Sequence, residues 1–154
     1  MKAMYINPFL NASMNLFKEY LNVSVTVSPP VLLKDPNELK EVSAIIGLAG
    51  DTVGAVVLTF SRETAIKMVS KFSGLSFMAI TNEVIDGVGE MVNIIAGNAK
   101  KDLEDYRIEI SLPGVITGNS YNINWPKGVP VISIPFQSEF GDFSVNVSMR
   151  DMKV

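Results

Sequence analysis

The chain contains no cysteine and no histidine. Without cysteine there is no disulfide framework and no thiolate nucleophile, and without histidine the usual general base at neutral pH is missing. Hydrolysis by a Ser-His-Asp or Cys-His arrangement and zinc sites with histidine ligands therefore cannot be built from this chain alone. Any chemistry must come from carboxylates, amides, hydroxyls, lysine or arginine.

Long hydrophobic runs and an excess of basic residues are also absent. No apolar run reaches the roughly 18 to 20 residues that cross a bilayer, and Met1 to Phe9 lacks the long apolar centre of a secretory signal. We therefore expect a cytoplasmic protein with no membrane partner. The net charge of −3 argues against nucleic acid as a partner. The acidic residues are dispersed, without an Asp-x-Asp cluster or a calcium loop, so we expect no metal site in the protein itself.

Three helices are predicted in a single domain over residues 1–154, of which 47% are hydrophobic. The first long helix is predicted to begin near Asn7-Pro8, with Asn7 as its cap, and to run to Leu21. The second long helix covers about Thr81 to Asp102. A shorter helix lies between them, with Ser61 as its cap and Gly74 at its end.

Alternation of apolar and polar residues predicts six or seven strands. They cover residues 23–27, 42–49, 52–60, 107–112, 121–125, 131–136 and 143–149. Two hairpins turn at Gly50-Asp51 and Gly141-Asp142, so a helix followed by a Gly-Asp hairpin occurs twice, which indicates an internal duplication. The expected fold class is α+β, with two long helices packed on a largely antiparallel sheet, a third helix at its end, and an internal pseudo-repeat of helix and β-hairpin.

The second long helix carries the segment Asp86-Gly-Val-Gly-Glu90-Met-Val-Asn93. At about 100° per residue, the side chains of Asp86, Glu90 and Asn93 project in nearly the same direction. We call these three residues the stripe. The opposite side of the helix is an apolar arc that can rest on a core, formed by Val84, Val88, Met91, Val92, Ile95 and Ala99. A solvated helix face is the simplest interpretation of such a stripe, because charged residues usually lie opposite an apolar arc.

Three glycines surround the stripe, at positions 87, 89 and 97. Each glycine in a helix interior costs about 0.5 to 1 kcal/mol relative to alanine. Either a partner surface approaches the helix closely at these positions, or close packing inside the protein requires them.

The spacing Asp-x-x-x-Glu-x-x-Asn, followed by Pro113 at the end of an extended run, resembles the CheC/CheX family of chemotaxis phosphatases. The single copy of the motif, the chain length and the order of helices and hairpins are similar to the CheX branch. Aligning the first long helix on the second places Asn7, Asn11 and Met14 opposite the three stripe residues, so the first copy lacks the site. Pro113 is expected to end its strand and to shape the loop beside the motif helix.

The resemblance implies that the protein removes phosphate from the phospho-aspartate of a CheY-like response regulator. Asn93 would orient the attacking water, Glu90 would pair with the active-site lysine of the regulator, and Asp86 would lie at the rim of the contact as a substrate-binding residue. An amide both donates and accepts hydrogen bonds, which suits phosphoryl transfer because that reaction depends on positioning and electrostatics. No cofactor of its own is expected, since the phosphorylated regulator would supply magnesium.

The resemblance also implies a homodimer with a continuous sheet. The alternating strand Phe143 to Met149 would offer unpaired backbone groups if it lay at a sheet edge, and we expect the Glu90/Asn93 faces to point away from the dimer interface. The alternative function is a non-catalytic binding module, in which the same helix face docks a response regulator or another chemotaxis protein, such as a deamidase, without turnover.

Overall fold

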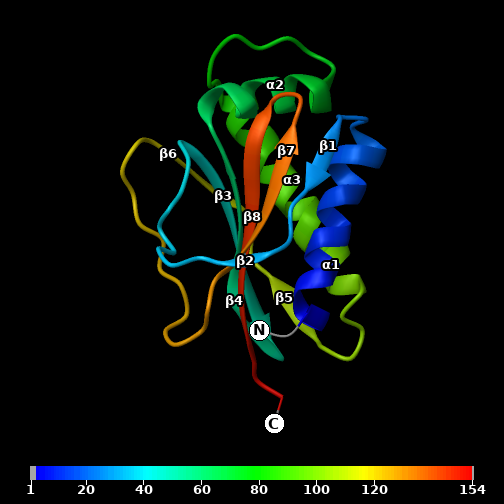
Figure 1. Ribbon diagram of the computed structural model, residues 1–154, viewed down its shortest axis with the longest axis vertical. Helices are drawn as coiled ribbons and strands as arrows, with labels where there is room; N and C mark the ends of the chain where they lie inside the picture. The colour runs from blue at the N-terminus through cyan, green and yellow to red at the C-terminus, as the bar shows by residue number, and fades with distance from the viewer. Residues whose placement is uncertain (1–2, 154) are drawn as a thin grey trace.

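A computed structural model describes residues 3–153 of the chain. Two long helices, α1 (Ala3–Met14) and α3 (Asn82–Lys101), lie side by side on one face of a β-sheet, and α2 (Arg62–Ser73) lies at one end of it (Figure 1). The helix α1 continues without a break as a π-helical segment, η1 (Asn15–Tyr20). Within residues 3–153, no helix is long and apolar enough to span a membrane.

The sheet has eight strands among the described residues, and all of their pairings are antiparallel. The strands are β1 (Val25–Val27), β2 (Val31–Leu32), β3 (Val42–Gly50), β4 (Thr52–Phe60), β5 (Ile108–Ile110), β6 (Gly114–Thr117), β7 (Ile132–Ser138) and β8 (Gly141–Asp151). Their order is β1-β7-β8-β4-β3-β5, with β2 also paired to β7 and β6 also paired to β3. The predicted α+β fold class is confirmed, although the sheet has more strands than the six or seven expected.

The two halves of the chain repeat the same order of elements. A long helix, two short strands and a β-hairpin occur first as α1, β1, β2, β3 and β4, and again as α3, β5, β6, β7 and β8. The short strands are exchanged, because β1 and β2 pair with the second hairpin whereas β5 and β6 pair with the first. Each half therefore completes the sheet of the other.

The predicted ends of α2 and α3 are confirmed by their caps. The Ser61 hydroxyl accepts a hydrogen bond from the Thr64 backbone N–H at 3.3 Å, and Thr81 accepts one from Val84 at 3.2 Å. Gly74 ends α2 with a φ of 74°, a left-handed conformation that costs glycine little. The first hairpin turns at Gly50 as predicted, with a φ of 99°.

The predicted start of the first helix is wrong, because α1 already includes Ala3 and Pro8 lies inside it. Tyr5 and Ile6 are buried together with Phe9, so the apolar side of the helix extends further towards the N-terminus than Asn7. Burial of these side chains outweighs the backbone hydrogen bond that Pro8 cannot donate. Residues 1, 2 and 154 lie outside the described residues, and the single domain over 1–154 remains a prediction.

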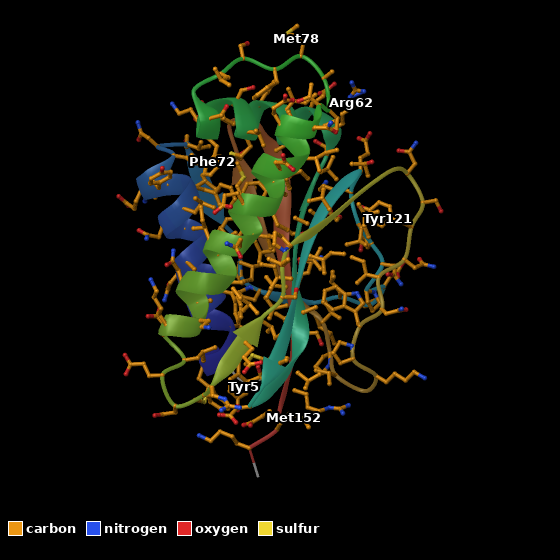
Figure 2. The ribbon with its side chains drawn as sticks, turned by 180° about the vertical axis from the view of Figure 1, so that it is seen from behind. Tyr5, Arg62, Phe72, Met78, Tyr121 and Met152 are labelled. Carbon is orange, nitrogen blue, oxygen red and sulfur yellow. The ribbon has the colours of Figure 1, made fainter. Side chains whose placement is uncertain are left out.

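The predicted strand at 121–125 is also wrong, and these residues form part of a loop that covers the sheet face opposite the helices (Figures 1 and 2). The hydroxyls of Tyr121 and Ser43 are 2.6 Å apart, and the Trp125 indole N–H donates to the Pro36 carbonyl at 3.1 Å. The alternating pattern of this segment therefore reflects one-sided packing of a loop. Two short strands were not predicted, β2 and β6, and each begins directly after a proline, Pro30 and Pro113.

Residues 143–149 do not lie at a sheet edge. They belong to β8, which pairs with β4 on one side and β7 on the other, so their backbone groups are satisfied inside the sheet. The real edges are β1 with β2 and β5 with β6, and each is interrupted by proline, at Pro29-Pro30 and at Pro113. The edge-strand argument for dimerisation is therefore wrong, while the homodimer itself remains a prediction from the family resemblance.

A hydroxyl–carboxylate cluster joins the ends of three elements. The hydroxyls of Tyr5 in α1 and Tyr106 in the α3–β5 loop donate to the Asp151 carboxylate of β8, at 2.8 and 2.7 Å. These hydrogen bonds lower the pKa of Asp151 and raise the pKa of Tyr106. The cluster fixes the loop that follows α3 to the base of the sheet.

Candidate functional site

The helix α3 carries the stripe, and its sequence favours a helix at both ends. Thr81 caps its first turn, where the local backbone and the Thr81 hydroxyl lower the pKa of Glu83. Lys100 and Lys101 lie in the last turn, where positive charge complements the helix dipole. The predicted apolar arc is buried against the sheet and the other helices. Burial of this arc fixes which side of α3 faces the core.

The structure brings the three stripe residues together on the side of α3 that faces away from the core. Asp86 and Glu90 are exposed, and Asn93 is half-buried. In Figure 2, α3 crosses the front of the molecule and no other element lies over it. The carboxylates and the amide thus lie on a face of α3 that no other element covers.

The glycines around the stripe divide into two kinds. A Cβ at Gly87 would lie 2.6 Å from a methyl of Val69 in α2, and a Cβ at Gly89 would lie 3.4 Å from Val115 and 3.7 Å from Pro113. Gly87 therefore permits close packing inside the protein, whereas a Cβ at Gly89 would meet its neighbours at ordinary contact distance. Gly97 has open space around the corresponding position, so it leaves low bulk on the outer side of α3, one turn after Asn93.

Pro113 packs beside the motif helix as expected, within a β-bulge that was not predicted. Ile110 pairs with Leu48 and Gly114 pairs with Ile45, so three residues on the edge strand oppose two on β3. The signal was present, because a proline between two short apolar runs indicates an edge or a bulge. The bulge brings Pro113 against α3 at Gly89, the residue that precedes Glu90.

Two adjoining hollows lie between α1 and α3, next to the stripe. They have volumes of about 420 and 260 Å³ and share Asn15 and Asn98. Lys101 also lines the first of them. A further hollow of about 520 Å³ lies at α2, close to the loop that carries Met78 (Figure 2). None of these hollows is lined by a stripe residue. The stripe therefore lies on an open surface, which suits a macromolecular partner better than a small enclosed ligand.

Within residues 3–153, no group of three or more Asp, Glu, His or Cys side chains is arranged to hold a metal ion. The carboxylates of Asp86 and Glu90 are the acidic members of the stripe. Oxygen-ligated cations such as Mg²⁺ take several ligands, and water molecules or phosphates complete the set when the protein supplies only one or two.

Comparison with known proteins places this chain among chemotaxis phosphatases of the CheC-like class. The chain is 31% identical to a CheC-like superfamily protein from Shewanella sp. PV-4, with a TM-score of 0.88 over 97% of this chain and 99% of that one. The family model described as chemotaxis phosphatase CheX matches residues 42–137, which include all of α3 and Pro113. The chain belongs to the CheX family.

Two further relatives are linked to the response regulator CheY by their names. CheY-P phosphatase CheX of Thermotoga maritima is 24% identical over 153 residues, covering 97% of this chain and 98% of the relative. The CheX chain in a CheX–CheY–BeF₃–Mg²⁺ complex from Borrelia burgdorferi is 30% identical, with a TM-score of 0.81 over 95% of this chain and 97% of that one. The predicted family is thus confirmed.

The two kinds of glycine predict opposite effects of alanine on stability. Gly87→Ala should lower the free energy of unfolding by about 1 kcal/mol, because overpacking against Val69 costs about 1 to 3 kcal/mol and better helix propensity returns only about 1. Gly97→Ala should instead raise it by up to about 1 kcal/mol. Urea denaturation of both variants measures these changes. Equal stabilisation by the two substitutions would contradict the packing described for Gly87.

Proposed function

We propose that this protein catalyses hydrolysis of the phospho-aspartate of a CheY-like response regulator. The observation that carries the proposal is the presentation of Glu90 and Asn93, one helical turn apart, on the outer side of α3 in a chain of the CheX family. The names of the Thermotoga and Borrelia relatives support the same substrate class. The proposal includes a cytoplasmic location and a homodimer that leaves both stripes accessible.

Asn93 positions the attacking water. Its carbonyl oxygen accepts a hydrogen bond from the water and its NH₂ group donates one, so the amide can fix the direction of attack without taking a proton. Phosphoryl transfer proceeds through a loose transition state in which positioning and electrostatics supply most of the catalysis. The half-buried position of Asn93 restricts its side chain more than full exposure would.

Glu90 holds the regulator in register. Its exposed carboxylate pairs with the active-site lysine of the regulator, which orients the phospho-aspartate relative to Asn93. Asp86 lies one turn further towards the N-terminus and contacts the regulator at the rim. The three residues thus have separate tasks along one helix face.

Magnesium enters with the substrate. The Borrelia complex contains CheY and Mg²⁺ together with its CheX chain, which supports the proposal that the regulator brings the metal. A bound Mg²⁺ neutralises charge that develops on the phosphoryl oxygens. This chain then needs to add only the water-positioning amide and the carboxylate that pairs with the lysine.

Replacing the amide tests the assigned catalytic role. Asn93→Ala should reduce the turnover number by roughly 10² to 10⁴, the range typical of one positioned catalytic group, while affinity for a beryllofluoride-treated regulator stays close to that of the wild type. The loss falls on turnover because the amide acts on water in the transition state. Dephosphorylation of a labelled regulator at substoichiometric enzyme measures it.

A matched control for this variant is Asn98→Ala, which removes an amide from the same helix outside the stripe. It should retain most of the activity. Wild-type turnover in Asn93→Ala would refute the role of this amide. Stoichiometric binding without turnover by the wild type would instead identify the protein as a binding module.

Replacing the carboxylate should mainly weaken complex formation. Glu90→Ala should raise KM more than it lowers kcat, and the KM of the wild type should increase with ionic strength because exposed charges are screened by salt. Steady-state kinetics at several salt concentrations measures both effects, with Glu104→Ala as a control carboxylate in the exposed loop after α3. A KM that responds neither to salt nor to Glu90→Ala would remove this ion pair from the mechanism.

The source of the magnesium can be tested by calorimetry. Titration of Mg²⁺ into the isolated protein should give no binding at micromolar concentrations. The stripe offers only two carboxylates, and Mg²⁺ held by two carboxylates also needs ligands such as phosphate oxygens. The same titration in the presence of the regulator should give binding. Tight binding to the isolated protein would contradict a metal supplied by the substrate.

A further inference from the structure

Leu112 is 92% exposed, although both of its neighbours are held by the fold. The Ser111 backbone N–H donates to the Gly47 carbonyl at 3.0 Å, and the Gly47 N–H donates to the Ser111 hydroxyl at 2.8 Å. On the other side, Pro113 packs against α3 at Gly89. The leucine at the tip of the bulge is therefore presented to solvent by a fixed backbone.

The bulge borders the stripe. Gly89 directly precedes Glu90, and residues four apart on a helix are surface neighbours, so Asn93 lies one turn beyond Gly89 on the same flank of α3. Pro113 and Val115 flank this side of the helix at Gly89. A partner that covers Glu90 and Asn93 therefore meets the flank of α3 on which the bulge packs.

The other half of the chain supplies an internal comparison. Val27 pairs with Phe136 and Val31 with Ser133, so the site-free half has a bulge of the same size, and the Ser28 N–H donates to the Pro135 carbonyl at 2.9 Å. The residue equivalent to Leu112 there is Pro29. The bulge thus forms without a leucine, and folding does not explain Leu112.

We propose that Leu112 is a hydrophobic docking residue for the response regulator, which it contacts through an apolar patch beside the phosphorylation site. This inference rests on the proposed function. A second copy of the chain fits the same edge less well, because the bulge breaks the row of backbone groups and Pro113 has no N–H to donate to an added strand. A regulator docked on α3 covers Leu112 without pairing to that edge.

The measurement is steady-state dephosphorylation together with a binding titration of the beryllofluoride-treated regulator. Burial of a leucine side chain contributes enough to raise affinity by roughly tenfold to a hundredfold. Leu112→Ser should raise KM and the dissociation constant by about that factor and leave kcat nearly unchanged, because the contact is equal in the ground and transition states. Leu112→Met should retain most of the affinity.

Leu32→Ser is the matched control, since Leu32 is 61% exposed on β2, in the edge strand of the site-free half. It should leave KM and affinity unchanged. Wild-type KM and affinity in Leu112→Ser would overturn the docking role. Sedimentation showing that the wild type is a dimer and that Leu112→Ser is a monomer would also overturn it, because Leu112 would then join two copies of this chain. A wild type that binds the regulator without turnover contradicts the phosphatase proposal alone, because the titration still measures the contribution of Leu112.

Discussion

The seating of α3 on the sheet is the interaction on which the rest of the structure depends. Val84, Val88, Met91, Val92 and Ile95 are fully buried on its inner side. A rotation of the helix that brought Asn93 towards the sheet would expose several of these side chains, each at a cost of about 1.5 to 3 kcal/mol. Contacts at Gly87 with α2 and at Gly89 with the bulge fix the helix along its length as well. The stripe is therefore oriented by the core, and no interaction among the stripe residues themselves is needed.

The pseudo-repeat shows that the fold alone does not create the stripe. Both halves contain a long helix and a bulged edge strand, and both bulges have the same pairing geometry. Only α3 carries the carboxylates and the amide in register, whereas α1 has Asn7, Asn11 and Met14 at the aligned positions. The α1 half also differs in its π-helical segment η1, which carries the buried residue Phe17. The ring centroids of Phe17 and Phe143 are 4.7 Å apart in the core. One half of the repeated scaffold thus lacks the stripe, and the other half presents it at the surface.

The sequence predicted most features that depend on local periodicity or local turn chemistry, but the second hairpin turns at Glu139-Phe140 and not at Gly141-Asp142, which already belong to β8. The bounds of α2 and α3, the turn at Gly50 and the common face of the stripe all follow from residues close together in the chain. The start of α1 and the segment 121–125 were wrong because burial by distant residues decided them, as for Pro8 and for Tyr121, which contacts Ser43. The alternation in residues 143–149 predicts a strand with two different faces, but it does not show which strands pair with it. The central position of β8 in the sheet therefore could not be predicted. The position of Pro113 beside α3 was expected, but the bulge that contains it depends on the pairing register of β3 with β5 and β6.

The absence of histidine agrees with the proposed site on an uncovered helix face. A general base works best where solvent is excluded and its pKa can be adjusted, and an exposed stripe offers neither condition. An amide has no proton equilibrium to adjust near neutral pH, so it keeps the same hydrogen-bonding capacity on the surface and in a contact. Under the proposed function, the enclosed and charged part of the reaction centre belongs to the regulator, and the catalyst contributes a rigid projection that completes it. Selectivity then depends on the surface around that projection, which in this chain consists of Asp86, the open side of α3 at Gly97 and the bulge at Leu112.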